Sequence, residues 1–351
     1  METELNTSTE HGGNSFRWDW ADFEDALEGL APQVLRSSVT LGLFDCLAEG
    51  PKSIEELSKA LALDQTALML LVNFLVARGV LDSRQEKLLL TRFSVQLLSS
   101  HRSMAAKWLH EDGPGRMLNQ AFDSMSDSVR TGMPAFRIKH GADFYGTIKD
   151  SYEAFTPSRG EYGRTLARKL IDSQALDGVE ELMDVGGGDG SFILEVLHER
   201  RNLYGKLIDL PGTASKARAS RMYGDVADRL SISEQSFFDP LPKTSGAIVL
   251  SNVLHNWNDS DAKKLIGNVA TSLAEGSSVF VIETCLDDLE PAPATSMALR
   301  MYLLCGGIER TRIQYEVLFQ SANLIPVGSC LLSNEIRLME FRARRIAKDL
   351  S

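Results

Sequence analysis

Apolar side chains recur every three or four residues along the first third of the chain, a spacing that predicts helices. Leu35, Val39 and Leu43 lie four residues apart and predict one apolar helix face. Gly50 and Pro51 follow, and this pair ends a helix. The pattern therefore predicts a helical beginning to the folded part of the protein.

Capping signals divide the next segment into two helices. Ser53 and Glu56 form a capping box that opens a short helix, and Asp64 is placed to cap a second helix that Gly79 ends. The following sequence, VLDSRQEKLLLT, predicts two short strands around a polar turn. Helix, helix and hairpin is the order of a winged helix.

From about Leu182 the apolar pattern changes to short runs separated by amphipathic segments. The runs ELMDV, GKLIDL, LSISEQ, GAIVLSNV and SSVFVIET predict strands, and Asp259 is expected to cap one of the helices between them. Strands that alternate with helices predict a parallel, doubly wound sheet covered on both faces. The predicted fold class is α/β, a Rossmann-like domain preceded by a mostly helical winged-helix domain.

The changes of pattern divide the chain into four parts. Residues 1–16 are polar and predict a disordered tail, and residues 17–100 predict the winged-helix-like domain. Residues 101–175 predict a helical connector broken near 132–136 and 140–146, and residues 176–351 predict the α/β domain.

The distribution of charge indicates whether the predicted winged helix binds DNA or has a structural role. The 351 residues carry 37 Lys and Arg against 48 Asp and Glu, a net charge of −11. Between Gly50 and Leu81 the basic and acidic side chains balance, so no basic stripe is available for phosphates. A structural role such as homodimerisation is therefore favoured over DNA binding, and no nucleic-acid partner is expected.

Composition also bears on the cellular location of the protein and on membrane and metal binding. No apolar run approaches the ~20 residues of a membrane span, and the polar N-terminus lacks the apolar core of a secretory signal. The four cysteines are scattered and form no metal-binding pattern. We expect a cytoplasmic protein with no membrane partner and no metal.

A glycine-rich loop, DVGGGDG, begins at Asp184 directly after the first strand of the α/β part. Such a loop is either a tight turn or a place where the backbone approaches a nucleotide-type ligand. Asp209 ends the next strand, where a ribose-binding carboxylate lies in this fold class. Because Asp189 would repel a pyrophosphate, the loop favours a cationic nucleoside such as S-adenosylmethionine over a dinucleotide.

One histidine stands apart from the other five. His255 follows the strand AIVLSNV, at the carboxyl end where doubly wound folds place their chemistry. The remaining histidines are expected to be structural.

Six motifs in succession resemble one family. DVGGGDGSF, IDLPG, SFFDPLP, LHNWND, VIET and GGIERT are similar to the motifs of class I S-adenosylmethionine-dependent small-molecule O-methyltransferases. This group includes caffeic acid, hydroxyindole and bacterial polyketide-tailoring enzymes. The N-terminal part resembles the winged-helix dimerisation domain of the same family, so the resemblance covers nearly the whole chain.

The resemblance implies a catalytic set. His255 matches the general base that takes a proton from the acceptor hydroxyl, and Glu283 and Glu309 match the two acids that orient it. A phenol with a pKa near ~10 needs such a base at neutral pH, and a histidine near ~6.5 can supply it.

The resemblance also implies cofactor and acceptor residues. S-adenosylmethionine, converted to S-adenosylhomocysteine, is expected to contact Gly186, Gly188, Gly190, Asp209, Ser236, Phe237, Ser251 and Trp257. The connector contributes to the acceptor pocket, with Phe155, Arg159 and Tyr162 as its candidate residues. Three positions depart from the family pattern, where Asp usually replaces Ser236 and Asn256 and plant members carry Lys in place of Ser251.

The sequence leaves two other functions open. Relatives of this family methylate carbon or use the bound cofactor for non-methylating reactions such as decarboxylation, hydroxylation and ring formation. A winged-helix regulator that senses a ligand is the alternative of another class, which the neutral charge between Gly50 and Leu81 disfavours.

Overall fold

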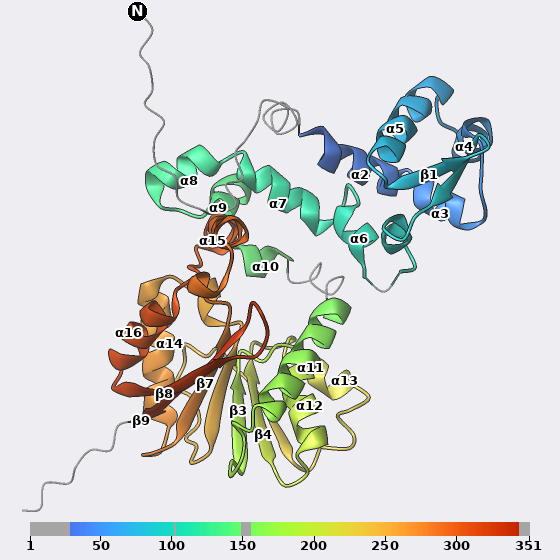
Figure 1. Cartoon of the computed structure of the whole chain (residues 1–351). Helices are drawn as coiled ribbons and strands as arrows, with labels where there is room; N and C mark the ends of the chain where they lie inside the picture. The colour runs from blue at the N-terminus through green and yellow to red at the C-terminus, as the bar shows by residue number, and fades with distance from the viewer. Residues whose placement is uncertain (1–28, 102, 149–155, 344–351) are drawn as a thin grey trace, which may run out of the picture. The chain divides into compact units, whose positions relative to one another are not determined.

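The structure is a computed structural model that describes residues 29–101, 103–148 and 156–343 (Figure 1). The predicted disordered tail, residues 1–16, lies outside the described residues. The chain divides into two compact units, residues 1–98 and 99–351.

The first unit contains helices and one hairpin, as the sequence predicts. Its elements are α2 (Leu30–Thr40), α3 (Leu43–Ala48), α4 (Ile54–Leu61), α5 (Gln65–Ala77), β1 (Leu81–Arg84), β2 (Lys87–Leu90) and the 3-10 turn η1 (Ser94–Leu97). The prediction of one helix through Leu35, Val39 and Leu43 is wrong. Gly42 takes a left-handed conformation, φ +73°, between α2 and α3, and so Leu43 begins a new helix.

The capping predictions in this unit are confirmed. Ser53 Oγ accepts a hydrogen bond from the backbone N–H of Glu56, whose own carboxylate accepts from the N–H of Ser53. Asp64 Oδ1 accepts from the N–H of Ala67, 2.8 Å away, and Gly79 follows α5 at φ +69°. These local bonds end and begin helices without help from distant residues.

Among its described residues, the second unit contains six helices followed by a sheet with its own covering helices. The first six are α6 (Ala105–Leu109), α7 (Pro114–Phe122), α8 (Met125–Thr131), α9 (Ala135–His140), α10 (Phe144–Ile148) and α11 (Thr156–Asp172). Gly132 and Gly141 end α8 and α9 in left-handed conformations, at the predicted breaks. The helices after them are α12 (Ser191–Glu199), α13 (Lys216–Ala219), η3 (Leu254–Asn256), α14 (Asp259–Ser272), η4 (Leu286–Asp288), α15 (Pro291–Cys305) and α16 (Arg312–Gln320).

The sheet of this unit has seven strands in the order β5-β4-β3-β6-β7-β9-β8. They are β3 (Glu181–Val185), β4 (Tyr204–Asp209), β5 (Leu230–Glu234), β6 (Ala247–Ser251), β7 (Ser278–Glu283), β8 (Leu324–Leu331) and β9 (Arg337–Ala343). Strands β3 to β7 are parallel, but β9 pairs antiparallel with both β7 and β8. The sheet is therefore mixed rather than parallel, because a short connection joins β8 to β9 and such a hairpin is antiparallel.

Helices cover both faces of the sheet (Figure 1), and an apolar layer lies between the sheet and the helices on each face. Side chains alternate between the layers along a strand: Leu182 packs with α11 and α12, and Met183 with α14 and α16. Both layers are made of buried aliphatic and aromatic residues. This explains why the parallel strands are apolar in continuous runs.

The connections place several loops at one edge of the sheet. The chain runs from β3 outward through β4 to β5 and then crosses back to β6 on the other side of β3, so the strand order reverses at β3. Ligands bind at this kind of reversal in open α/β sheets. The predicted cap of α14 is wrong by one residue, since Asn258 Oδ1 accepts from Asp261 N and Asp259 is the first residue of the helix.

Among the described residues no single helix is long and apolar enough to cross a membrane. One pair, α4 with α5, passes on length and composition when joined, but the two helices bend by 120° at the break between them.

Candidate active site

The glycine loop connects β3 to α12 in backbone conformations that few other residues adopt. Gly186, Gly188 and Gly190 have φ values of +75°, +62° and +76°. Gly187 is required by space instead, because a Cβ there would lie 2.4 Å from Asp184 Cγ and 2.6 Å from a Leu207 methyl. Four positions of the loop therefore favour glycine, three because the backbone is left-handed and one because a Cβ would not fit.

Two aspartates flank this loop. Asp209, at the end of β4, accepts from the backbone N–H of Gly188 at 2.8 Å and from that of Leu210 at 2.7 Å. Burial raises the pKa of Asp209, and these two N–H groups partly offset the rise. Asp184, the last residue but one of β3, is 1% exposed, and in the described part of the chain neither of its carboxylate oxygens has a hydrogen-bond partner. Burial and the negative charges of Asp209 and Asp189 raise the pKa of Asp184 to about 8.

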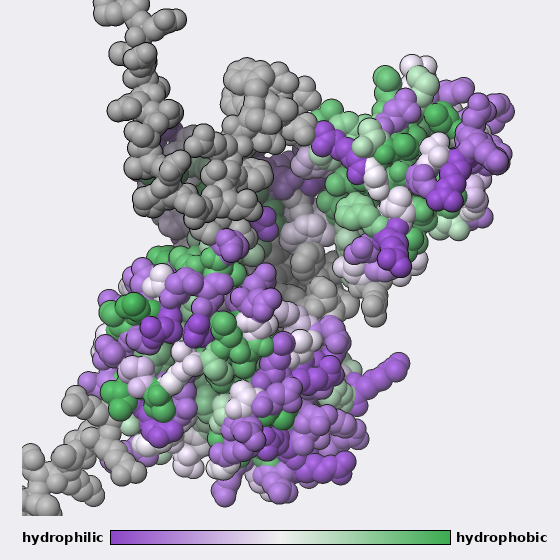
Figure 2. Space-filling view, in the orientation of Figure 1, coloured by the Kyte–Doolittle hydropathy of each residue, from purple (hydrophilic) through white to green (hydrophobic). Residues whose placement is uncertain are grey.

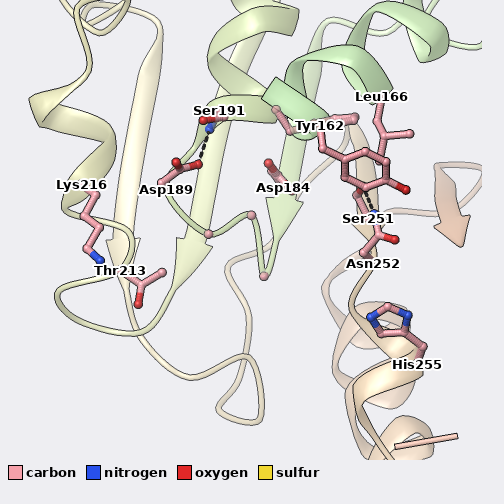
Figure 3. A pocket seen from close by; sticks show the side chains of 15 residues that line it. Tyr162, Leu166, Asp184, Asp189, Ser191, Thr213, Lys216, Ser251, Asn252 and His255 are labelled. Atoms are coloured by element: carbon pink, nitrogen blue, oxygen red, sulfur yellow. Dashed lines mark hydrogen bonds between the residues drawn. The ribbon is translucent and has the colours of Figure 1, made fainter. Parts of the chain in front are cut away.

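A cavity of about 250 Å³ lies over the loop. Its lining comes from α11, the glycine loop, the segment after β4 and the segment after β6: Tyr162, Gly163, Leu166, Asp184, Gly186, Gly187, Gly188, Asp189, Ser191, Phe192, Thr213, Lys216, Ser251, Asn252 and His255. Figure 3 shows Thr213 and Lys216 at one end of the view and His255 at the other, with the loop between them.

His255 stands on the short turn η3, after β6. Its Nδ1 lies 3.2 Å from Glu309 Oε1 and 3.4 Å from Glu283 Oε2. Glu283 ends β7 and is fully buried, and its other oxygen accepts from the backbone N–H groups of Val253 and Leu254 at 3.0 and 2.7 Å. Burial raises the pKa of Glu283. The charge of His255 lowers this pKa, and the charge of Glu309 raises it further. The fold thus brings the three predicted catalytic side chains together.

Arg310 fixes the turn that carries His255, and sequence reasoning missed it. The guanidinium is 1% exposed and donates to the carbonyls of Leu254 and Trp257, at 3.1 and 2.8 Å, and to Asp259 at 2.8 Å. Gly307 also lies against this turn, because a Cβ there would be 2.2 Å from the carbonyl oxygen of His255. The segment that supplies Glu309 is therefore locked to the segment that supplies the imidazole.

The predicted cofactor residues divide into two groups. Gly186, Gly188 and Ser251 line the cavity, whereas Gly190, Asp209, Ser236, Phe237 and Trp257 are not among its lining residues. Phe237 and Trp257 form an edge-to-face pair with centroids 5.7 Å apart. A Cβ on Gly186 would come within 3.4 Å of the Phe237 ring, so this aromatic pair lies directly beside the loop. Ser236 Oγ accepts from the N–H of Phe238 at 3.2 Å.

Tyr162 is the acceptor candidate whose side chain the structure describes. Tyr162, on α11, is 43% exposed and lines the cavity. Figure 3 shows the Tyr162 ring above Asn252. Phe155 lies outside the described residues, and Arg159 is described only as a position of α11.

Ten further lining residues were not among the predicted site residues: Gly163, Leu166, Asp184, Gly187, Asp189, Ser191, Phe192, Thr213, Lys216 and Asn252. Asp184 and Gly187 belong to the glycine loop motif, so their place in the motif was the available signal. Asn252 has a positive φ of +53°, and Lys216 comes from α13. Within the described ranges, no three His, Cys, Asp or Glu side chains gather in a way that could hold a metal ion.

Comparison with known families and proteins identifies both halves of the chain. The O-methyltransferase domain matches residues 122–324, and the O-methyltransferase dimerisation domain matches residues 25–100. The chain is 30% identical to aclacinomycin 10-hydroxylase RdmB of Streptomyces purpurascens, over 90% of this chain and 88% of that protein.

Two further similarities concern enzymes of the methylating kind. The chain is 31% identical to 2,7-dihydroxy-5-methyl-1-naphthoate 7-O-methyltransferase of Streptomyces carzinostaticus, over 85% of this chain and 91% of that enzyme. It also matches, at 28% identity and a TM-score of 0.74, the crystal structure of an O-methyltransferase from neocarzinostatin biosynthesis. That structure contains S-adenosylmethionine and 2-hydroxy-5-methyl naphthoic acid, and the match covers 90% of this chain and 96% of the other.

The glycine loop, the cavity and the histidine between two buried acids thus lie in a chain that both family profiles match. The protein belongs to the S-adenosylmethionine-dependent O-methyltransferases that act on small molecules of secondary metabolism.

Proposed function

We propose that this enzyme transfers a methyl group to a phenolic hydroxyl of a small molecule and that His255 is the general base. The observation that carries the proposal is the position of His255 on the cavity wall with Glu283 and Glu309 both at its Nδ1. Two carboxylates on that side favour the tautomer with the proton on Nδ1. The lone pair then lies on Nε2, where it can accept the hydroxyl proton.

The two acids have distinct tasks in this proposal. Glu283 is held by the N–H groups of Val253 and Leu254, so it fixes the orientation of the turn as well as the imidazole. Glu309, at 3.2 Å from Nδ1, stabilises the positive charge that the ring gains when the acceptor oxygen loses its proton. Neither acid needs to take up the proton itself.

The cavity fits a cationic cofactor. Asp184 presents a buried carboxylate with no hydrogen-bond partner among the described residues, and a positive group of S-adenosylmethionine would satisfy it. Gly186, Gly187 and Gly188 leave backbone beside the ligand where a Cβ would fill space. The bound cofactor supplies an electrophilic methyl group on a sulfonium.

Other residues complete the proposed cofactor site. Asp209 would accept from the ribose hydroxyls, and its bond to Gly188 N already holds the carboxylate beside the loop. Ser236, Phe237 and Trp257 would surround the adenine, supported by the contact of the Phe237 ring with the Gly186 position. Ser251 lines the cavity, while Gly190 serves the turn into α12.

In this proposal, α11 and the segment after β6 bind the acceptor. Tyr162 and Asn252 line the cavity together, and a Tyr ring can stack on an aromatic acceptor. The naphthoate O-methyltransferase to which this chain is similar supports a fused aromatic phenol as the acceptor class. Phe155 and Arg159 stay predictions for the same pocket.

A second candidate reaction is hydroxylation. The 30% identity to aclacinomycin 10-hydroxylase favours it, since the two chains match over nearly their whole lengths. An intact base with two acids supports methyl transfer instead, because hydroxyl deprotonation is the task for which this arrangement is built. C-methylation ortho to a phenol would use the same deprotonation.

One experiment separates these reactions. The purified enzyme is incubated with methyl-labelled S-adenosylmethionine and a panel of hydroxynaphthoates, anthraquinones and amino-acid-derived phenols, and the products are analysed by mass spectrometry. O-methylation adds a labelled methyl group that fragments from oxygen, whereas C-methylation leaves it on the ring. A product that gains oxygen without label would overturn the proposal in favour of hydroxylation.

We also propose that the first unit forms a homodimer. It matches the dimerisation domain, and several of its large apolar side chains are exposed, among them Leu30, Leu41, Leu70 and Phe93. Figure 2 shows hydrophobic residues, coloured green, on the surface of this unit. Exposed apolar side chains in such number favour association over monomeric solution.

A further inference from the structure

Asp184 is a buried acid with an unusual position. It is the last residue but one of β3, is 1% exposed and lines the cavity, and neither of its carboxylate oxygens has a hydrogen-bond partner among the described residues. Gly187 keeps the space beside it open, because a Cβ at Gly187 would lie 2.4 Å from Asp184 Cγ. An ionised carboxylate in this place loses its hydration and gains no bond in return.

The charged groups around Asp184 do not compensate for that loss. Asp189, on the loop, and Asp209, at the end of β4, both raise the pKa of Asp184 in addition to the effect of burial, to about 8. Lys216 from α13 and His255 from η3 line the same cavity, but neither donates a hydrogen bond to Asp184. Without a ligand, Asp184 is therefore mainly a neutral carboxylic acid near neutral pH.

We propose that Asp184 keeps a proton until the cationic cofactor binds and then releases it, so that cofactor binding and proton release are one coupled event. The carboxylic acid O–H bond breaks, the proton passes to the solvent, and the carboxylate becomes the counter-ion of the ammonium and sulfonium charges. The cofactor thereby brings into the cavity the positive charge that makes an ionised Asp184 stable.

This inference rests on the cofactor of the proposed function but not on its methyl-transfer step. S-adenosylhomocysteine keeps the ammonium group of the cofactor, whereas 5′-methylthioadenosine has the same nucleoside and carries no positive charge. The coupling is therefore tested by binding alone, with no acceptor present and no reaction.

The experiment is titration calorimetry on the full-length protein at about pH 7, in two buffers of different ionisation enthalpy. The difference in binding heat between the buffers gives the number of protons released. With a pKa of about 8 in the free protein, Asp184 carries nearly one proton at this pH, so S-adenosylhomocysteine should release close to one. We expect 5′-methylthioadenosine to release none.

Two variants assign the proton. Asp184→Asn should bind S-adenosylhomocysteine without proton release, since an amide has no proton to lose. Asp177→Asn is the matched control, because Asp177 pairs with Arg200 at 3.0 Å on the surface and is absent from the cavity lining. This control should release the same number of protons as the wild type.

Equal release with both ligands, release that persists in Asp184→Asn, or no release with S-adenosylhomocysteine overturns the proposal. If Asp184→Asn does not fold, the comparison of the two ligands on the wild-type protein still decides the question. A protein that shows the coupling but transfers no methyl group would leave this inference standing and overturn only the proposed reaction.

Discussion

Nδ1 of His255 lies 3.2 Å from Oε1 of Glu309, although the two residues belong to segments far apart in the sequence. The next residue, Arg310, donates to the carbonyls of Leu254 and Trp257, which flank the histidine on its turn. The acid and the imidazole are thus held at this distance by the backbone contacts of a neighbouring side chain as well as by their own attraction. Such rigid support is what an accurately placed base requires.

The first prediction concerns His255, the proposed general base. We expect His255→Gln to lower turnover by ~10²–10⁴, the usual contribution of a positioned general base. Its affinity for S-adenosylhomocysteine should stay close to that of the wild type. With a phenolic acceptor, raising the pH toward ~10 should partly restore the variant, because free phenolate needs no base. Steady-state kinetics across pH measures this, and near-wild-type turnover of the variant at neutral pH would exclude His255 as the base.

The second prediction concerns the support of the turn. We expect Arg310→Ala to lower the free energy of unfolding by about 3 kcal/mol or more, because several buried acceptors lose their donor. Turnover should fall with it, since the His255 turn loses its anchor. Arg312→Ala is the control, because Arg312 pairs with the nearby Glu316 on α16 and should change stability by less than about 1 kcal/mol. Chemical denaturation measures the free energy of unfolding of both variants, and equal losses would contradict the role assigned to Arg310.

The third prediction concerns the glycine loop. A Cβ at residue 187 would lie 2.4 Å from Asp184 Cγ and 2.6 Å from a Leu207 methyl, so Gly187→Ala must displace the loop. We expect at least a tenfold loss of affinity for S-adenosylhomocysteine, a cost of about 1.4 kcal/mol, together with lower stability. Gly267→Ala is the matched control on α14, where a Cβ meets nothing within 4 Å. It should leave affinity unchanged and raise stability by about 0.5–1 kcal/mol, since alanine is the better helix former.

The fourth prediction concerns the pH dependence of stability. The folded-state pKa of Asp184 is raised to about 8, so its contribution favours the folded state below the ordinary pKa of an aspartate and is lost as pH rises toward 8. Relative to Asp184→Asn, the free energy of unfolding of the wild type should therefore fall between about pH 4 and pH 8, by up to about 1.4 kcal/mol per pH unit. Above about pH 8 the difference should level off. Urea unfolding of both proteins across this range gives the curve, and a constant difference would show that Asp184 does not carry the proton.

The fifth prediction concerns assembly. Light scattering at micromolar concentration should give twice the 38.7 kDa mass of the chain. Charged substitutions at the exposed Leu30 and Leu70 should reduce that mass, whereas a substitution at the exposed Tyr204 of the second unit should not. A wild-type mass of one chain under these conditions rules the dimer out.

Local signals in the sequence predicted many element boundaries correctly. The capping box of Ser53 and Glu56 and the glycine that ends α5 act through bonds between residues a few positions apart, which a linear pattern displays. The break before Leu43 was missed because apolar spacing alone does not reveal that Gly42 turns left-handed. Strands β8 and β9 were missed as well, and with them the mixed character of the sheet, because pairing with β7 is decided by distant residues.

The sequence by itself determined the class of the fold, the glycine loop, and the residue types of the proposed site, since each is written in motifs or in short-range spacing. Only the tertiary structure brought Glu283 and Glu309 to the same nitrogen of His255, because β6, β7 and the segment after α15 meet only when the sheet forms. It alone also showed that Arg310 locks this turn and that Asp184 is buried without a partner among the described residues. Burial and unpaired charge are properties of a packed environment, and no single residue in a sequence carries them.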